Sequence, residues 1–193
     1  GGDRGDARRV ADVIDNVADL LALQRRLRPA ASALSLGGRQ LDYDALDRLV
    51  WRIATALARA GAAPGDVLAL TFADDLLHMA AVHAIARLGA TAFGMPSADS
   101  PVRRRASAAQ ARAVAMVTDL ERVDDAGLPV HRLDLQALAD AGAPVDPGVR
   151  AARPVAPWLL IQGSGSTGRS KLIPLTHACT LARVRIRAAG TPV

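Results

Sequence analysis

The sequence predicts an α/β fold in which helices flank a mainly parallel sheet. Short apolar runs alternate with helical segments through the middle of the chain, and a loop rich in glycine and serine follows the last apolar run. Alternation of this kind is typical of strand–helix–strand units, whose parallel strands are joined by right-handed crossovers. We expect strands over 67–72, 90–95, 114–118 and 158–162.

The expected helices carry their own start and stop signals. Apolar residues at helical spacing predict an amphipathic lead helix over 10–27. Asp42 is the expected N-cap of the next helix, and Gly61 is its expected C-terminal stop. A helix over 75–88 follows the first strand, and Ser100 with the proline after it begins another.

The last third of the chain is expected to add two strands and a helix around the loop. Residues 130–135 are predicted as an edge strand, and 140–157 as a connection rich in glycine, alanine and proline. Residues 172–176 read as a strand after the loop, and a helix begins at about His177. The glycine-rich loop therefore joins two strands.

Composition favours an ordinary globular protein of the cytoplasm. The chain has 193 residues, half of them hydrophobic, which suits one domain or slightly more. A single cysteine, Cys179, excludes an intrachain disulfide, and no run approaches the roughly 20 apolar residues that a membrane span needs. The start lacks both methionine and a signal pattern, which indicates a processed tag or a piece of a longer protein.

Charge is distributed unevenly and favours a small phosphorylated ligand. Up to Gly148 there are 17 arginines and 19 acidic residues, whereas from Val149 onward there are six arginines, one lysine and no acid. Nucleic acid is not expected as a partner, because the chain has only five aromatic residues and none lies among the arginines. Alternatively, these arginines pair with acids elsewhere or with a missing part of the protein.

The loop itself has the composition of a phosphate-binding segment. Residues 163–168 read Gly-Ser-Gly-Ser-Thr-Gly, and Lys171 follows. Glycines let backbone N–H groups approach a polyphosphate closely, hydroxyls add donors, and an ammonium group neutralises charge. Lys171 is the only lysine among 24 basic residues. Its compact ammonium group on a flexible stem differs in shape and hydrogen-bonding geometry from the planar guanidinium of arginine.

Three familiar glycine-containing motifs do not fit this loop. A Walker A loop needs lysine directly after its last glycine, but Arg169 and Ser170 intervene here. The glycines do match G-x-G-x-x-G, yet that fingerprint opens a helix and is followed by an acidic residue about 20 positions later. Here a strand is expected over 172–176, and no acid follows Asp146. The serine-hydrolase elbow fails as well, since Ser164 stands where its first glycine should be.

Residues 163–177 resemble the signature loop of the adenylate-forming superfamily, which includes acyl-CoA synthetases, nonribosomal-peptide adenylation domains and luciferases. The family pattern is roughly T-S-G-S-T-G-x-P-K-G-V-x-x-T-H, and this chain keeps the S-G-S-T-G core, the lysine and the closing Thr-His. It departs from the pattern at Gly163, Ser170 and Leu172, where the family has threonine, proline and glycine.

Upstream segments extend the resemblance over about residues 35–190. Residues 41–47 resemble the family stretch L-T-Y-x-E-L-D, and 61–72 resemble G-V-x-P-G-D-x-V-A-L. The end of the helix at 87–90, followed by Met95 and its proline, resembles K-A-G-A…P. The resemblance implies the fold of the first subdomain of the family's N-terminal domain.

The resemblance also implies a reaction and its site. A carboxylic acid attacks the α-phosphate of ATP, bound with Mg²⁺, and the resulting acyl-adenylate passes to a thiol of CoA or a carrier protein. The loop would hold the β- and γ-phosphates, and Lys171 would be catalytic by stabilising the departing pyrophosphate. The nucleotide-binding residues implied are Gly163, Ser164, Gly165, Ser166, Thr167, Gly168 and Lys171.

The family's remaining machinery is expected downstream of this chain. We divide the sequence into a lead helix and linker, 1–35, and the first part of an AMP-binding N-terminal domain, 36–193, without the C-terminal domain. The chain is expected to be an N-terminal fragment of an AMP-forming acid–thiol ligase, inactive without the remainder of the enzyme. The alternative is a truncated, noncatalytic nucleotide-binding or interaction module.

Other candidate residues receive structural interpretations. His78 and His83 are five apart on one predicted helix and His131 is isolated, so no metal site is expected. His177 is assigned a hydrogen bond at a helix start, and Cys179 a place in the core. The arginines at 103–105 are interpreted as a solvated helix face.

Overall fold

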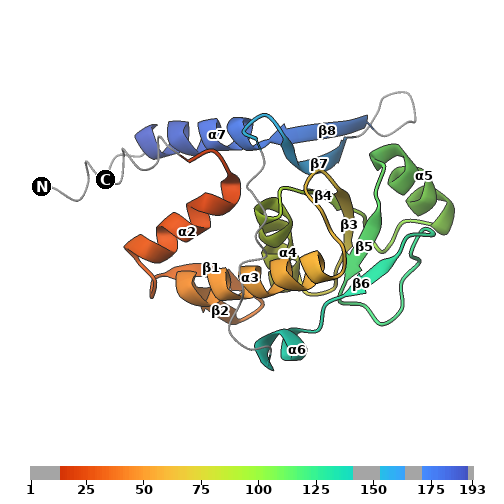
Figure 1. Cartoon of the computed structure of the whole chain (residues 1–193), viewed down its shortest axis with the longest axis horizontal. Coiled ribbons are helices and arrows are strands. Elements are labelled where there is room, and N and C mark those ends of the chain that lie inside the picture. The colour runs from red at the N-terminus through yellow and green to blue at the C-terminus, as the bar shows by residue number, and fades with distance from the viewer. Residues whose placement is uncertain (1–13, 141–152, 164–170, 191–193) are drawn as a thin grey trace, which may run out of the picture.

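A six-stranded sheet forms the centre of the computed structural model, which describes residues 14–140, 153–163 and 171–190 (Figure 1). The strand order is β6-β5-β3-β4-β7-β8, and all neighbours are parallel except β7 and β8. The predicted α/β fold with a mainly parallel sheet is therefore confirmed. The strands are β3 (Val67–Thr71), β4 (Thr91–Gly94), β5 (Ala115–Thr118), β6 (Val130–Arg132), β7 (Pro157–Gly163) and β8 (Lys171–Thr176).

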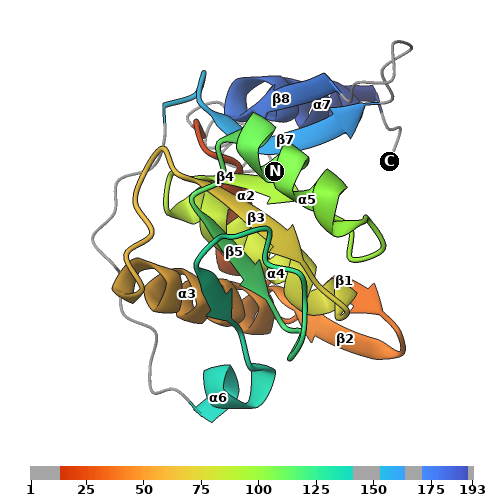
Figure 2. The same cartoon turned by 90° about the vertical axis from the view of Figure 1, so that its right-hand side faces the viewer.

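Helices cover both faces of this sheet, as Figure 2 shows with α5 on the side opposite to α4. Leu68 and Leu70 of β3 pack with α3 and α4, whereas Ala69 between them packs with α5. Because both faces are covered, β3 reads as a nearly unbroken apolar run. The helices are α2 (Val17–Leu27), α3 (Tyr43–Arg59), α4 (Asp75–Arg87), α5 (Pro101–Ala111), α6 (Leu135–Asp140) and α7 (His177–Gly190).

The helix caps follow the sequence signals closely. The carboxylate of Asp42 accepts a hydrogen bond from the Ala45 N–H at 2.7 Å, and Ser100 accepts one from the Arg103 N–H. Gly61, with a φ of 98°, directly follows the C-cap of α3. These side chains and this glycine satisfy backbone groups that a helix leaves unpaired at its ends.

Four features differ from the sequence prediction. The lead helix begins at Val17 with Asn16 as its N-cap, so the prediction of a helix already at 14–16 was wrong; residues 10–13 lie outside the described part. A hairpin of β1 (Ser32–Leu36) and β2 (Arg39–Asp42) was not predicted, although Gly37 and Gly38 supply the positive φ that a tight turn requires. Helix α6 was also missed, and β6 ends at Arg132.

A buried carboxylate joins three helices on the α3 side of the sheet. Asp47 of α3 has a side chain only 1% exposed, and it pairs with Arg25 of α2 at 3.0 Å and Arg87 of α4 at 2.7 Å. The Arg87 guanidinium also lies 4.4 Å from the centre of the Trp51 ring. This cluster ties α2 into the helical layer (Figure 1). The division at 35/36 stays a prediction.

Among the residues that the structure describes, no helix is both long and apolar enough to cross a membrane.

Candidate functional site

The candidate site lies at the edge of the sheet where the parallel strands end. Chain segments leave β3, β4, β5 and β7 at this edge, and in open α/β sheets ligands bind outside the carboxyl ends of strands. The strand order reverses beside β3, because α4 leads from β3 to β4 on one side and α5 leads back to β5 on the other. The glycine-rich loop follows β7, which is next to β4.

The two ends of that loop are held by strand pairing. Gly163, the last residue of β7, is the partner of Lys171, the first residue of β8, in an antiparallel register that extends back to Pro157 and Thr176. Lys171 is exposed to solvent. The other predicted binding residues, which are Ser164, Gly165, Ser166, Thr167 and Gly168, lie outside the described residues. The pairing brings Gly163 and Lys171 together.

Gly163 has a packing reason to be glycine. A β-carbon at this position would lie 3.2 Å from Cδ1 of Ile173 and 3.7 Å from the Lys171 carbonyl oxygen. A threonine, as in the family pattern, would therefore require the Ile173 side chain to shift by a few tenths of an ångström. The glycine at position 163 therefore leaves room for the bulky side chain of Ile173 on the neighbouring strand.

The ends of β3 and β4 are covered by the protein's own side chains on the α5 side. Arg104 of α5 is only 1% exposed and donates to the Pro96 carbonyl at 2.6 Å and to Thr71 Oγ1 at 3.0 Å. Thr71 in turn donates to the Met95 carbonyl at 2.7 Å. The interpretation of 103–105 as a solvated face was thus wrong for Arg104, which points into the sheet edge; Arg103 and Arg105 are exposed.

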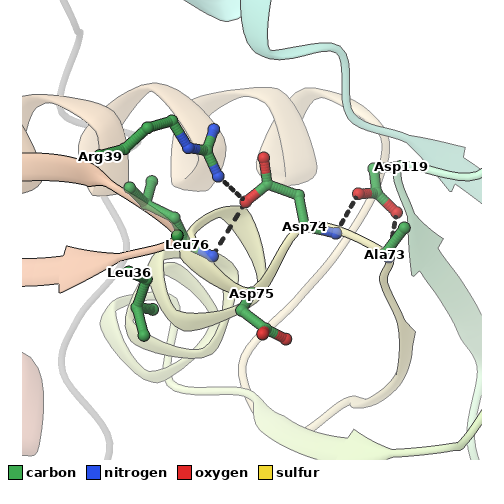
Figure 3. Close-up of a pocket in the computed structure, with 8 residues that line it drawn as sticks. Leu36, Arg39, Ala73, Asp74, Asp75, Leu76 and Asp119 are labelled. Atoms are coloured by element: carbon green, nitrogen blue, oxygen red, sulfur yellow. Dashed lines mark hydrogen bonds and ion pairs between the residues drawn. The ribbon is translucent and has the colours of Figure 1, made fainter.

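A separate cavity of about 420 Å³ lies at the ends of β3 and β5 (Figure 3). Three carboxylates line it, of which Asp74 and Asp119 are engaged: Asp119 accepts the N–H groups of Ala73 and Asp74 at 2.9 and 2.8 Å. Asp74 caps α4 and pairs with Arg39 at 2.6 Å, and that hydrogen bond lowers the Asp74 pKa. The excess of acid over base makes this cavity unfavourable for a phosphate.

His177 occupies a buried position at the start of α7, as expected for a residue that serves a helix start. Its Nδ1 accepts a hydrogen bond from the Val17 N–H at 3.1 Å, so the helix start that it satisfies belongs to α2. The residue has no exposed surface, and burial lowers its pKa. The Trp158 ring lies 6.4 Å away, centre to centre. A neutral imidazole is required here, because the protonated ring cannot accept.

Stability is expected to fall in mild acid partly through His177. The pKa of His177 in the folded chain lies below the ordinary value of about 6.5, so the unfolded chain binds a proton more readily. The contribution of His177 to the free energy of unfolding is therefore fully present above about pH 6.5 and declines as the pH falls below that value. His177→Gln, which keeps an acceptor but does not titrate, should reduce this slope by up to about 1.4 kcal/mol per pH unit. Urea unfolding at pH 7.5 and 5.5 measures it; equal slopes in both proteins would contradict the assignment.

The remaining histidines and the cysteine have ordinary surroundings. His78 stacks on Phe72 with ring centres 5.5 Å apart, and burial lowers the pKa of both His78 and His83. In the described ranges no group of three or more histidine, cysteine or acidic side chains could hold a metal ion. Cys179 lies in α7 but is exposed, so its predicted core position was wrong. The buried face of α7 carries His177 and Leu181 instead.

The comparison with family models decides the family. The model described as "AMP-binding enzyme" matches residues 21–190. The chain belongs to the AMP-binding enzyme family. This match confirms the predicted resemblance to adenylate-forming enzymes. It also confirms that the family of this chain is one of ligases that form adenylates.

The proteins that this chain is similar to are longer than the chain. An isonitrile lipopeptide synthase of Mycobacterium tuberculosis is 31% identical over 84% of the chain, which spans 6% of that protein. A salicyl-AMP ligase / salicyl-S-ArCP synthetase of the same organism is 30% identical over 79% of the chain, which spans 30% of that protein. The solved structure of VinN with 3-methylaspartate matches with a TM-score of 0.78 at 23% identity, covering 90% of this chain and 51% of VinN.

Proposed function

We propose that this chain supplies the phosphate-binding part of an AMP-forming ligase, which activates a carboxylic acid as an acyl-adenylate and transfers it to a thiol. The observation that carries the proposal is the pairing of Gly163 with Lys171, which fixes both ends of a Gly/Ser/Thr segment at the carboxyl edge of the sheet. Such segments offer backbone and hydroxyl donors to phosphates. Family membership makes ATP the nucleotide that the segment would meet.

Lys171 has the role of neutralising charge on the β- and γ-phosphates. It is the first residue of β8, it is exposed, and its partner across the strands is the first glycine of the loop. As the acid attacks the α-phosphate, negative charge grows on the departing pyrophosphate, and a fixed ammonium stabilises that charge. The predicted binding residues are Gly163, Ser164, Gly165, Ser166, Thr167, Gly168 and Lys171, of which Lys171 is also the predicted catalytic residue.

Magnesium is expected to arrive with the nucleotide. Mg²⁺ bound to ATP is usually held by the phosphates, waters and one or two carboxylates. The described residues offer no metal-binding cluster, and at the β3 and β5 ends the carboxylates of Asp74 and Asp119 are occupied by backbone N–H groups and Arg39. We therefore assign no Mg²⁺ ligand to this part of the chain.

The partners proposed are a carboxylic acid, a CoA or carrier-protein thiol and the remainder of the ligase. A relative named for forming salicyl-AMP and salicyl-S-ArCP supports an acid substrate and a carrier thiol. The chain spans about half of VinN and less of the curated relatives, so we expect the acid and thiol sites to require further polypeptide. Without it, the 193 residues should not catalyse adenylation.

The test is exchange of labelled pyrophosphate into ATP, dependent on a carboxylic acid, by a protein of the relatives' length that contains this sequence. Lys171→Ala should slow exchange about 10- to 150-fold, because a charge-assisted contact is worth about 1.5–3 kcal/mol. Arg105→Ala, which removes an exposed cation on α5, is the matched control and should leave the rate unchanged.

Three outcomes of the exchange assay would count against the proposal. Full activity of Lys171→Ala would remove the role given to the loop. Exchange by the 193-residue chain alone would show that it needs no further part. Binding of ATP without exchange in the longer protein would favour the noncatalytic nucleotide-binding module instead.

A further inference from the structure

Helix α7 packs on the rest of the chain through one face of its first half. His177 and Leu181, four residues apart, are buried in this face, where they lie against Trp158 and α2. Figure 1 and Figure 2 show α7 at the outer margin of the fold. From residue 182 to residue 187 every position of the helix is exposed. The second half of α7 therefore has little apolar support in this chain.

The outward face of α7 is apolar all the same. It carries Cys179, Ala182 and Ile186, whose spacing of three and four residues places them on one side of a helix. All three are exposed, and Ile186 is 71% exposed. Free cysteine is among the residue types most often buried in proteins. A helix that is apolar on opposite sides is typical of one packed between two layers of structure.

The second half of α7 is also poorly suited to a helix that stands in water. Residues 183–187 read Arg-Val-Arg-Ile-Arg, and the branched side chains of valine and isoleucine lose rotamer freedom in a helix. Arg183 and Arg187 are four residues apart, a spacing at which like charges repel. Most helical stability in proteins comes from packing rather than from propensity. This half of the helix therefore needs a cover.

The charges around the outward face select the kind of cover. Arg183, Arg185 and Arg187 surround Ile186, and the chain has no acid from Val149 onward. A second copy of this chain would place these arginines against one another, which is unfavourable. An acidic polypeptide would complement them. Because this chain spans about half of VinN and 30% of the salicyl-AMP ligase, a ligase of their length has further polypeptide that could supply it.

We propose that the remainder of the ligase docks on the outward face of α7, formed by Cys179, Ala182 and Ile186, through an apolar segment flanked by acidic side chains. The inference rests on the proposed function and gives one of its partners a place on this chain. The apolar side chains supply the buried area, and the arginines supply partner choice. Cys179, exposed here, then lies in the core of the longer protein.

Labelling of Cys179 tests this cover directly. N-ethylmaleimide should modify Cys179 at least about 10-fold more slowly in a protein of the relatives' length that contains this sequence than in the 193-residue chain, because a covered thiol reacts only when the contact opens. Mass spectrometry of the peptide that carries Cys179 follows the reaction. Val102→Cys is the control: this position on α5 is 73% exposed, and its cysteine should react equally fast in both proteins.

Ile186→Gln should have an effect only in the longer protein. In the 193-residue chain the side chain lies mostly in water, so the thermal midpoint should not change. In the longer protein the midpoint should fall by about 2 °C or more, because an apolar contact is replaced by an amide. Val102→Gln replaces a branched residue that is equally exposed on α5, and it should leave both midpoints unchanged.

Three results would overturn the inference. The first is equal labelling of Cys179 in the two proteins, and the second is a lower midpoint for Ile186→Gln in the 193-residue chain. The third is a dimer of the 193-residue chain that Ile186→Gln dissociates, because the occupant would then be a second copy. If the longer protein exchanges pyrophosphate while Cys179 stays open, only this inference fails. If Cys179 is protected and no exchange occurs, the proposed function fails and the docking surface stands.

Discussion

Replacing Arg104 by methionine is expected to lower the free energy of unfolding by about 3–5 kcal/mol. The buried guanidinium donates to Thr71 Oγ1 and to the carbonyls of Met95, Pro96 and Asp124. Methionine fills part of the volume but removes the donor from all four acceptors, of which Thr71 and Met95 are buried. Urea unfolding followed by circular dichroism measures the change.

Arg105→Met is the control for Arg104, because the two residues are adjacent on α5 and Arg105 is exposed. Substitution of an exposed residue away from such networks usually changes stability by no more than about 0.5 kcal/mol. A loss below about 1 kcal/mol for Arg104→Met would contradict the claim that this arginine holds the ends of β3 and β4 together.

Asp47→Asn is expected to cost about 3–5 kcal/mol of stability, because it leaves the charge of Arg87 in the helical layer without its partner. The Arg87 side chain is only 9% exposed, and Asp47 also anchors Arg25 of α2. Amide exchange should therefore show α2 becoming less protected than α3. The measurement is hydrogen exchange together with urea unfolding.

Asp44→Asn is the comparison for Asp47. Asp44 also pairs with Arg25, at 2.8 Å, but both side chains are partly open to solvent, and pairs of that kind contribute about 0–1 kcal/mol. Equal losses for Asp44→Asn and Asp47→Asn would mean that burial of Asp47 does not set its contribution.

The strands and caps could be predicted because their signals are local. The apolar run of β3 and the N-caps Asp42 and Ser100 are visible in a few consecutive residues, and the structure places them within a residue of the prediction. The hairpin of β1 and β2 was predictable too, since Gly37-Gly38 lies between alternating polar and apolar residues.

Burial of single side chains was less predictable. Spacing shows that Arg103, Arg104 and Arg105 point in different directions on a helix, but not which of them meets the sheet. Arg104 does so because α5 packs over Thr71 and Met95, residues that lie on other strands or after them. Cys179 is exposed for a similar reason, since contacts with α2 and β7 select the buried face of α7.

The candidate site was only partly predictable. The two strands joined by a loop were predicted from the sequence, but the antiparallel pairing that places Gly163 and Lys171 within the strands was not. The position of Arg104 over the ends of β3 and β4 depends on contacts between distant segments, as does the buried amide nitrogen of Gln162, which has no partner among the described residues. A single sequence carries no signal for either.

The most direct test of the account compares the binding of MgATP and AMP to the 193-residue chain. If the segment from Gly163 to Lys171 holds the β- and γ-phosphates, the wild-type chain and Arg105→Ala should bind MgATP more tightly than AMP. Lys171→Ala should lose about 10-fold or more of that preference while keeping its affinity for AMP. Equal affinity of the wild type for the two nucleotides, or an unchanged preference in Lys171→Ala, would contradict the account.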